Sequence, residues 1–210
     1  MQLHPITRRL VAPIAVAVAL LASAAGSATA SLVPGDDAWC DSSAGSQVFL
    51  PWADPATYTL APGGSFETNK SRWTLVAASR ETTDNEPFNV SGANDYSSLS
   101  IANGGLALSP AMCVGIGEPT ARVFFKQTGG LPWAALRIDV LFDDASGTTQ
   151  AQTIGVVGVA QQWRLSPQLL TTAHLLPTLG AGITAVAFRF TAIGGSFQID
   201  DLYVDPWHRP

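Results

Sequence analysis

The chain has 210 residues, of which 47% are hydrophobic and only 13% charged, and its formal net charge at pH 7 is −5. An acidic chain with 11 Lys and Arg residues, and no basic run after its first nine residues, is a poor partner for nucleic acid or anionic lipid. Two cysteines and three histidines also leave no recognisable zinc set.

The first thirty residues have the order of a secretory signal peptide. Arg8 and Arg9 precede a small and apolar run over 10–25, and the segment closes with Ala28-Thr29-Ala30. The run is shorter than the ~20 residues of a comfortable membrane helix, so we expect cleavage after Ala30, with an uncleaved anchor as the alternative. The remainder, which has no further stretch of membrane-spanning length, would hold 9 basic and 16 acidic residues, a net charge of −7.

Residues 31–62 differ in composition from the rest of the chain. They are rich in Pro, Asp and Ser, yet they include the apolar stretch 48–52. A free tail has no use for such residues, so we expect an extended N-terminal arm that lies against the folded domain. Cys40 in this arm and Cys113 are the only cysteines, which predicts one disulfide in an exported chain, with two separate buried thiols as the alternative.

The remaining pattern predicts strands and almost no helix. Short β-branched and aromatic runs alternate with Gly, Pro, Asn and Asp, which favours an all-β sandwich or barrel. The predicted strands are 47–50, 73–78, 88–91, 98–102, 107–114, 121–127, 136–142, 149–157, 162–166, 184–191 and 196–204. A short helix is possible only over 169–179, where Pro177 would end it.

Two connections predict hairpins. The segment 143–147 reads Asp-Asp-Ala-Ser-Gly between two predicted strands, and 193–196 reads Ile-Gly-Gly-Ser between the last two. Asp at the start of a turn and Gly near its end are typical of hairpin loops.

Two motifs carry a resemblance to a known family. Gly63-Gly64-Ser65-Phe66-Glu67 is followed by Trp73, and 197–204 reads Phe-Gln-Ile-Asp-Asp-Leu-Tyr-Val. At these positions the chain resembles the galactose-binding-like jelly-roll domains, especially carbohydrate-binding modules. The family pattern is interrupted here by Ser65 and closes with Leu202 in place of Val. The resemblance implies a two-sheet jelly-roll β-sandwich over 63–206, after the arm and before a short tail over 207–210.

The same resemblance implies a structural calcium. In those modules the motif glutamate, a carboxylate of the closing Asp pair and backbone carbonyls hold the ion, which corresponds here to Glu67 and to Asp200 or Asp201. Calcium prefers six to eight oxygen ligands, so carboxylates from distant strands suit it. Adjacent strand residues face opposite sides, so only one aspartate can reach the ion unless a bulge intervenes. The alternative is that Glu67 is a solvated acid and the Asp pair ends a strand.

The whole chain, with its Val-Phe-Leu-Pro-Trp arm and the Val-Ala-Phe-Arg-Phe strand at 186–190, also resembles a group of small secreted bacterial proteins that lack a catalytic partner domain. No Gly-x-Ser-x-Gly elbow occurs, and the acid groups at 143–144 and 81–86 fall in predicted turns, where acids usually form turns. We therefore do not expect an enzyme.

Candidate ligand-binding residues are aromatic side chains near polar ones, because sugar rings stack on aromatic faces. These are Trp133, Trp163 and Tyr96, although burial in the core is the alternative for both tryptophans. We expect a secreted, non-catalytic and monomeric module that binds a glycan or another cell-envelope component. The rival hypotheses are a structural or protein-interaction domain of the envelope and, third, a small glycosidase or lyase.

Overall fold

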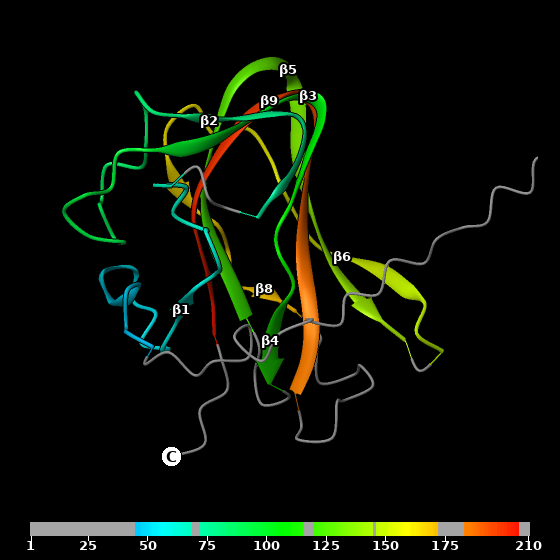
Figure 1. Ribbon diagram of the computed structural model, residues 1–210. Helices are drawn as coiled ribbons and strands as arrows, with labels where there is room; N and C mark the ends of the chain where they lie inside the picture. The colour runs from blue at the N-terminus through cyan, green and yellow to red at the C-terminus, as the bar shows by residue number, and fades with distance from the viewer. Residues whose placement is uncertain (1–44, 69–71, 116–119, 145, 172–182, 206–210) are drawn as a thin grey trace, which may run out of the picture.

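The computed structural model describes residues 45–68, 72–115, 120–144, 146–171 and 183–205. The predicted signal peptide, Cys40 and the tail over 207–210 lie outside these residues, as does most of the predicted helix. The described strands are β1 (Thr59–Leu60), β2 (Thr74–Glu81), β3 (Ser98–Leu108), β4 (Met112–Gly115), β5 (Thr120–Asp143), β6 (Thr149–Val157), β7 (Arg164–Leu165), β8 (Leu169–Leu170) and β9 (Ile183–Val204). The fold class is all-β, and these strands join in one antiparallel sheet that folds over on itself as a β-sandwich (Figure 1).

The two layers of the sandwich are made largely from the same strands. β5 and β9 pair antiparallel along nearly their whole length, from Ala121 opposite Val204 to Phe142 opposite Val186. Figure 1 shows both strands passing over the top of the molecule and down the other side. We call the half with 120–130 and 195–204 the first layer, and the half with 135–143 and 183–193 the second layer. The strand order across the sheet is β2-β3-β9-β5-β6.

The strands bend where the pairing register shifts, between Gly130 and Ala135 of β5. Gly130 has a φ of +117°, and a Cβ atom built on it would lie 2.2 Å from the Cα of Gly195. Only glycine combines this backbone conformation with so close an approach.

We therefore expect Gly130→Ala to destabilise the protein by about 2 kcal/mol or more, since strained backbone positions cost roughly 1–3 kcal/mol before any clash. Gly129→Ala is the matched control, because a Cβ at Gly129 meets no atom within 4 Å among the described residues. Urea unfolding of both variants measures the difference, and equal losses would contradict the account of the bend.

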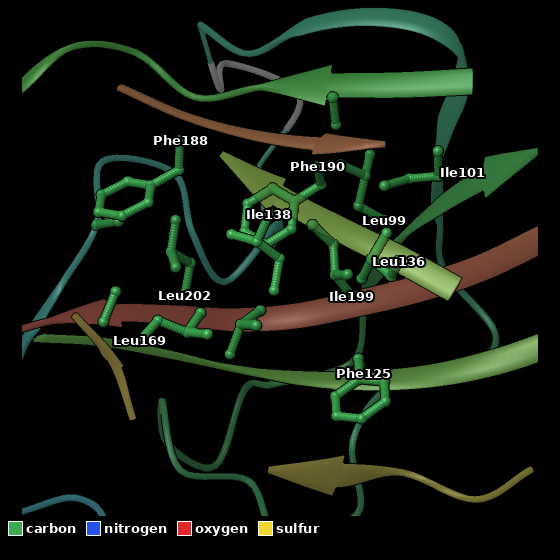
Figure 2. Packing of buried hydrophobic residues seen from close by; sticks show 14 of the residues in the cluster. Leu99, Ile101, Phe125, Leu136, Ile138, Leu169, Phe188, Phe190, Ile199 and Leu202 are labelled. Carbon is green, nitrogen blue, oxygen red and sulfur yellow. The ribbon is translucent and has the colours of Figure 1, made fainter. Parts of the chain in front are cut away.

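Apolar side chains from both layers fill the space between them. Phe188, Phe190 and Ile138 of the second layer and Phe197 and Ile199 of the first are all fully buried in one cluster. Figure 2 shows such residues packed between the strands. Phe66 and Trp73 of the opening motif belong to the same cluster, with ring centroids 5.0 Å apart, so this motif contributes to the core.

Several sequence predictions were wrong in detail. The segment 193–196 is no hairpin, because it lies inside β9, which continues through it. Residues 50–52 form a 3-10 turn in place of the strand predicted at 47–50, and 88–91 is a turn. Leu169 and Leu170, at the start of the predicted helix, form β8. The hairpin at 143–147 is confirmed by the pairing of Asp143 with Thr149.

The described part of the predicted arm, 45–62, lies against the outer face of the first layer. Phe49 and Tyr58 of the arm are buried in a second apolar cluster together with Phe124 of β5 and Tyr203 of β9. Asp54 ties the same segment to β5 through an ion pair of 2.8 Å with Arg122.

Candidate functional site

A bulge in β9 turns two neighbouring aspartates toward one loop. Arg122 stands opposite Tyr203 and Phe124 opposite Asp200, so one residue of β5 faces two of β9. Asp201 has a φ of +51°, in the left-handed region that few side chains adopt without strain. The bulge thus directs Asp201 away from the regular alternation of the strand.

Asp201 meets two further acids that come from the loop between β2 and β3. Carboxylate oxygens of Glu86, Asp95 and Asp201 lie within 4.8 Å of one another, and all three residues are at most 1% exposed. Three carboxylates from sequence-distant segments thereby converge on one buried point.

The electrostatics of this cluster favour a compensating positive charge. Neither oxygen of Asp95 nor of Asp201 has a hydrogen-bond partner among the residues that the structure describes. Burial, with the nearby charges of Asp95 and Glu86, raises the pKa of Asp201 to about 8. Burial also raises the pKa of Asp95 and of Glu86. Unpaired buried carboxylates are costly, and a cation bound between them would offset that cost.

Asp200 lies beside the cluster, but its carboxylate accepts backbone hydrogen bonds. Its two oxygens accept the backbone N–H of Asp201 at 2.9 Å and of Glu86 at 3.2 Å. Burial and the charge of Asp201 raise its pKa to about 10. Asp200 therefore ties the bulge to the loop that carries Glu86.

Glu67, the other residue predicted from the motif, also lies next to the cluster but outside the set of three. Its Oε1 accepts the backbone N–H of Tyr96 at 2.8 Å and of Ser97 at 2.6 Å. It thus positions the residues that follow Asp95. Of the predicted metal residues, the structure brings Asp201 into the set, and it adds Glu86 and Asp95, which the motif comparison missed.

A pocket of about 520 Å³ lies where β5 bends. Its lining offers amide and hydroxyl groups beside apolar ones: Gln127, Thr128, Gly129, Gly130, Leu131, Pro132, Val159 and Gln161. The Nε2 of Gln127 donates to the carbonyls of Gly129 and Leu131, both at 3.3 Å. This leaves the amide oxygen of Gln127 as an acceptor for a ligand hydroxyl.

Trp133 follows the pocket residues in β5 and is 65% exposed. A Cβ built on Gly194 would lie 2.5 Å from Cζ3 of Trp133, so the ring rests directly on the backbone of Gly194. A tryptophan supported in this way offers an open aromatic surface to a ligand.

Trp163 is placed differently, although it was predicted for the same role. Its Nε1 donates to Asp84 at 3.2 Å, and the Nζ of Lys126 lies 5.1 Å from its ring centroid. The side chain also packs against the second apolar cluster, which joins the arm to the first layer. These contacts occupy the ring, so Trp163 is poorly suited to stack on a sugar. Tyr96 is 61% exposed but adjoins the acidic cluster, and the structure does not bring it to the bend.

Two of the other acids serve turns, as predicted. Asp144 accepts the N–H groups of Ser146 and Thr148, and hydrogen bonds led by those from Ser146 and Gln150 lower its pKa to about 2. Glu81 accepts the N–H groups of Thr82 and Thr83. Asp84 and Glu86 are exceptions, because Asp84 pairs with Lys126 and Glu86 is fully buried in the cluster described above.

Cys113 lies in β4 opposite Ala185, and the described part of the chain holds no free cysteine. Because Cys40 lies outside the described residues, its disulfide with Cys113 stays a prediction. Within the described ranges, no helix is long and apolar enough to span a membrane.

The chain is similar in structure to several carbohydrate-binding modules. No protein-family model and no curated protein matches it. The CBM22-1 and GH10 modules of endo-1,4-β-D-xylanase 10B from Clostridium thermocellum, complexed with xylohexaose, match with a TM-score of 0.49 and 18% identity, over 68% of this chain and 28% of that chain. This chain thus spans well under a third of the xylanase chain.

Two single modules give similar values. The CBM22-1 xylan-binding domain of Xyn10C from Paenibacillus barcinonensis matches with a TM-score of 0.45 and 14% identity, over 72% of this chain and 94% of that one. TmCBM61 in complex with β-1,4-galactotriose matches with a TM-score of 0.43 and 13% identity, over 69% and 96%. Because these TM-scores are below 0.5, we take the function from the side chains described above.

Proposed function

We propose that this protein is an exported, non-catalytic glycan-binding module that holds a structural calcium ion. The observation that carries the glycan proposal is Trp133, which is exposed, rests on Gly194 and directly follows the stretch 127–132 that lines a pocket with two glutamines. The signal-like order of the first thirty residues supports export.

The pocket has the chemistry that a sugar needs. The apolar faces of Trp133 and Leu131 can contact the C–H surface of a sugar ring, while Gln127 and Gln161 can bond its hydroxyls. All the lining residues are uncharged, so recognition would rest on stacking and neutral hydrogen bonds. Such a site binds and orients a glycan without supplying a nucleophile or a general acid.

Calcium is the ion that best fits the cluster of Glu86, Asp95 and Asp201. All the side-chain donors are carboxylate oxygens, which hard divalent cations prefer over the nitrogen and sulfur ligands that zinc selects. The unpartnered oxygens of Asp95 and Asp201 are available to such an ion. Bound calcium would neutralise the carboxylates and join β9 to the loop between β2 and β3.

Trp133→Ala tests the glycan site. Stacking contacts of this kind contribute on the order of 1 kcal/mol or more, so we expect a loss of affinity of about fivefold or more for whichever soluble oligosaccharide the wild type binds. Tyr96→Ala is the matched control, because it removes another exposed aromatic, one that adjoins the acidic cluster. Isothermal titration against xylan, galactan, glucan and peptidoglycan fragments gives the affinities. Equal losses in both variants, or no binding of any glycan by the wild type, would overturn the proposal.

A further inference from the structure

The carboxylate of Glu86 faces the proposed cation site and also closes a turn. Its oxygens lie within 4.8 Å of those of Asp95 and Asp201. The same carboxylate accepts the backbone N–H of Val90 at 2.9 Å and that of Phe88. The position of Glu86 therefore determines the position of the turn over 86–90.

That turn packs against the N-terminal arm. The ring of Phe88 stacks on Phe124 of β5, with centroids 5.4 Å apart and planes 29° apart. It also meets Trp52 of the arm edge to face, at 5.0 Å. Tyr203 donates a hydrogen bond of 3.4 Å to the carbonyl of Val90. Phe88 thus packs against both the arm and the first layer, beside the direct contact of Trp52 with Phe124 at 5.4 Å.

The loop is the part of the acidic cluster that can move. Asp201 belongs to β9, which pairs with strands on both sides, whereas Glu86 and Asp95 both lie in the loop between β2 and β3. Phe88 is 47% exposed, so neighbouring residues cover the turn only in part. Repulsion among three buried carboxylates is most easily relieved by displacement of this loop.

We infer that a divalent cation at Glu86, Asp95 and Asp201 controls docking of the arm. The bound cation holds Glu86 in place, Glu86 holds the turn, and Phe88 of the turn holds Trp52. Removal of the cation loosens the loop and lets the arm open while the sandwich stays folded. This inference rests on the proposed cation site and adds to it a regulated segment of the chain.

The physical consequence depends on compartment. Calcium sites of extracellular modules bind with dissociation constants on the order of 10⁻⁴ to 10⁻³ M. With an affinity in that range, the arm closes in a calcium-rich medium and opens in a calcium-poor one.

Hydrogen exchange of the full-length protein tests the inference. The backbone N–H of Ala61 in the arm donates to the carbonyl of Leu202 in β9 at 2.8 Å, so its exchange reports docking of the arm. We expect calcium to slow exchange over 45–62 at least tenfold relative to excess chelator. The amides near Phe190, in the middle of β9, should change little and serve as the internal control.

Phe88→Ala separates the arm from the cation site. In this variant we expect calcium still to bind, as measured by isothermal titration, while the arm exchanges rapidly with or without it. Trp52→Ala removes the same contact from the arm side and should behave alike, which guards against a folding defect in either variant. If calcium binds the wild type and arm exchange does not change, the inference is wrong while the cation site stands. If calcium does not bind, the cation proposal fails and the inference with it.

Discussion

Replacing Asp201 by asparagine is expected to stabilise the calcium-free protein and to remove the stabilisation that calcium gives the wild type. In chelator, burial of Asp201 beside Asp95 and Glu86 costs stability, as repulsion when the group is charged and as proton uptake when it is neutral, and asparagine keeps its shape without that cost. In calcium, the same change deletes a charged ligand. A single substitution thus has opposite effects in the two conditions, which a residue with only a packing role would not show.

Thermal unfolding in excess chelator and in millimolar calcium measures this prediction. A chain of this size shifts its Tm by about 2 to 4 °C per kcal/mol, so differences of several degrees are expected in each condition. Glu67→Gln is the matched control, because the amide oxygen can still accept the N–H groups of Tyr96 and Ser97. This control should keep the calcium shift. A wild-type protein with no calcium shift, or a variant destabilised in chelator, would contradict the cation site.

The pH dependence in chelator follows from the same groups. The pKa of Asp201 is raised to about 8 in the folded protein by burial and by the charges of Asp95 and Glu86, against about 3.9 in the unfolded chain. The folded state therefore holds more protons between these values, so stability should fall as the pH rises from about 4 to 8. Asp201→Asn should flatten that decline.

Asp54→Ala is expected to cause the second large effect, a loss of about 3 to 5 kcal/mol, because removing one member of a buried ion pair leaves the other uncompensated. Asp54 is only 4% exposed in its side chain and lies 2.8 Å from the guanidinium of Arg122. It also accepts hydrogen bonds from Tyr58 at 2.8 Å and Gln168 at 3.0 Å. Burial alone would raise the pKa of Asp54, but hydrogen bonds led by those from Tyr58 and Gln168 lower it overall.

Urea unfolding at pH 7 in millimolar calcium, where the arm is closed, gives the size of this loss, and Asp54→Asn gives the share that is due to charge, since asparagine can still accept some of the same bonds. Because the pKa is lowered, the charged contribution is present above about pH 4 and disappears at lower pH. The difference between wild type and variant should therefore shrink on acidification. A loss below about 1 kcal/mol, the range of exposed ion pairs, would show that the arm contributes little to the folded state.

The sequence predicted the class of fold and many strands, but not how the strands continue through the bend. Gly194 and Gly195 permit a hairpin turn or a bent strand equally well, because glycine accepts both backbone conformations. The choice is made by pairing with β5, in which 121–130 and 135–142 form one ladder with β9. Such pairing joins residues far apart in the chain, and local pattern does not encode it.

The site was predicted in part for a related reason. Asp201 stood out because it lies in a recognisable closing motif, whereas Glu86 and Asp95 lie in a loop without regular structure. Glu86 did appear among the acids of 81–86, where its neighbours Glu81 and Asp84 are turn or surface residues, and nothing local distinguishes a buried acid from a solvated one. Trp133 and Trp163 looked equivalent in sequence, and only their neighbours in space separate them.

The central place of β9 has a consequence for how the protein is made. β1, β3, β4 and β5 all pair with this strand, which comes last among the described elements. While a ribosome is still synthesising the chain, both layers lack their central strand until 183–204 have emerged, and only neighbours such as β5 and β6 can pair. Topologies with such distant contacts fold slowly. The nascent chain should therefore remain open through most of its synthesis, the state in which a polypeptide can be threaded across a membrane.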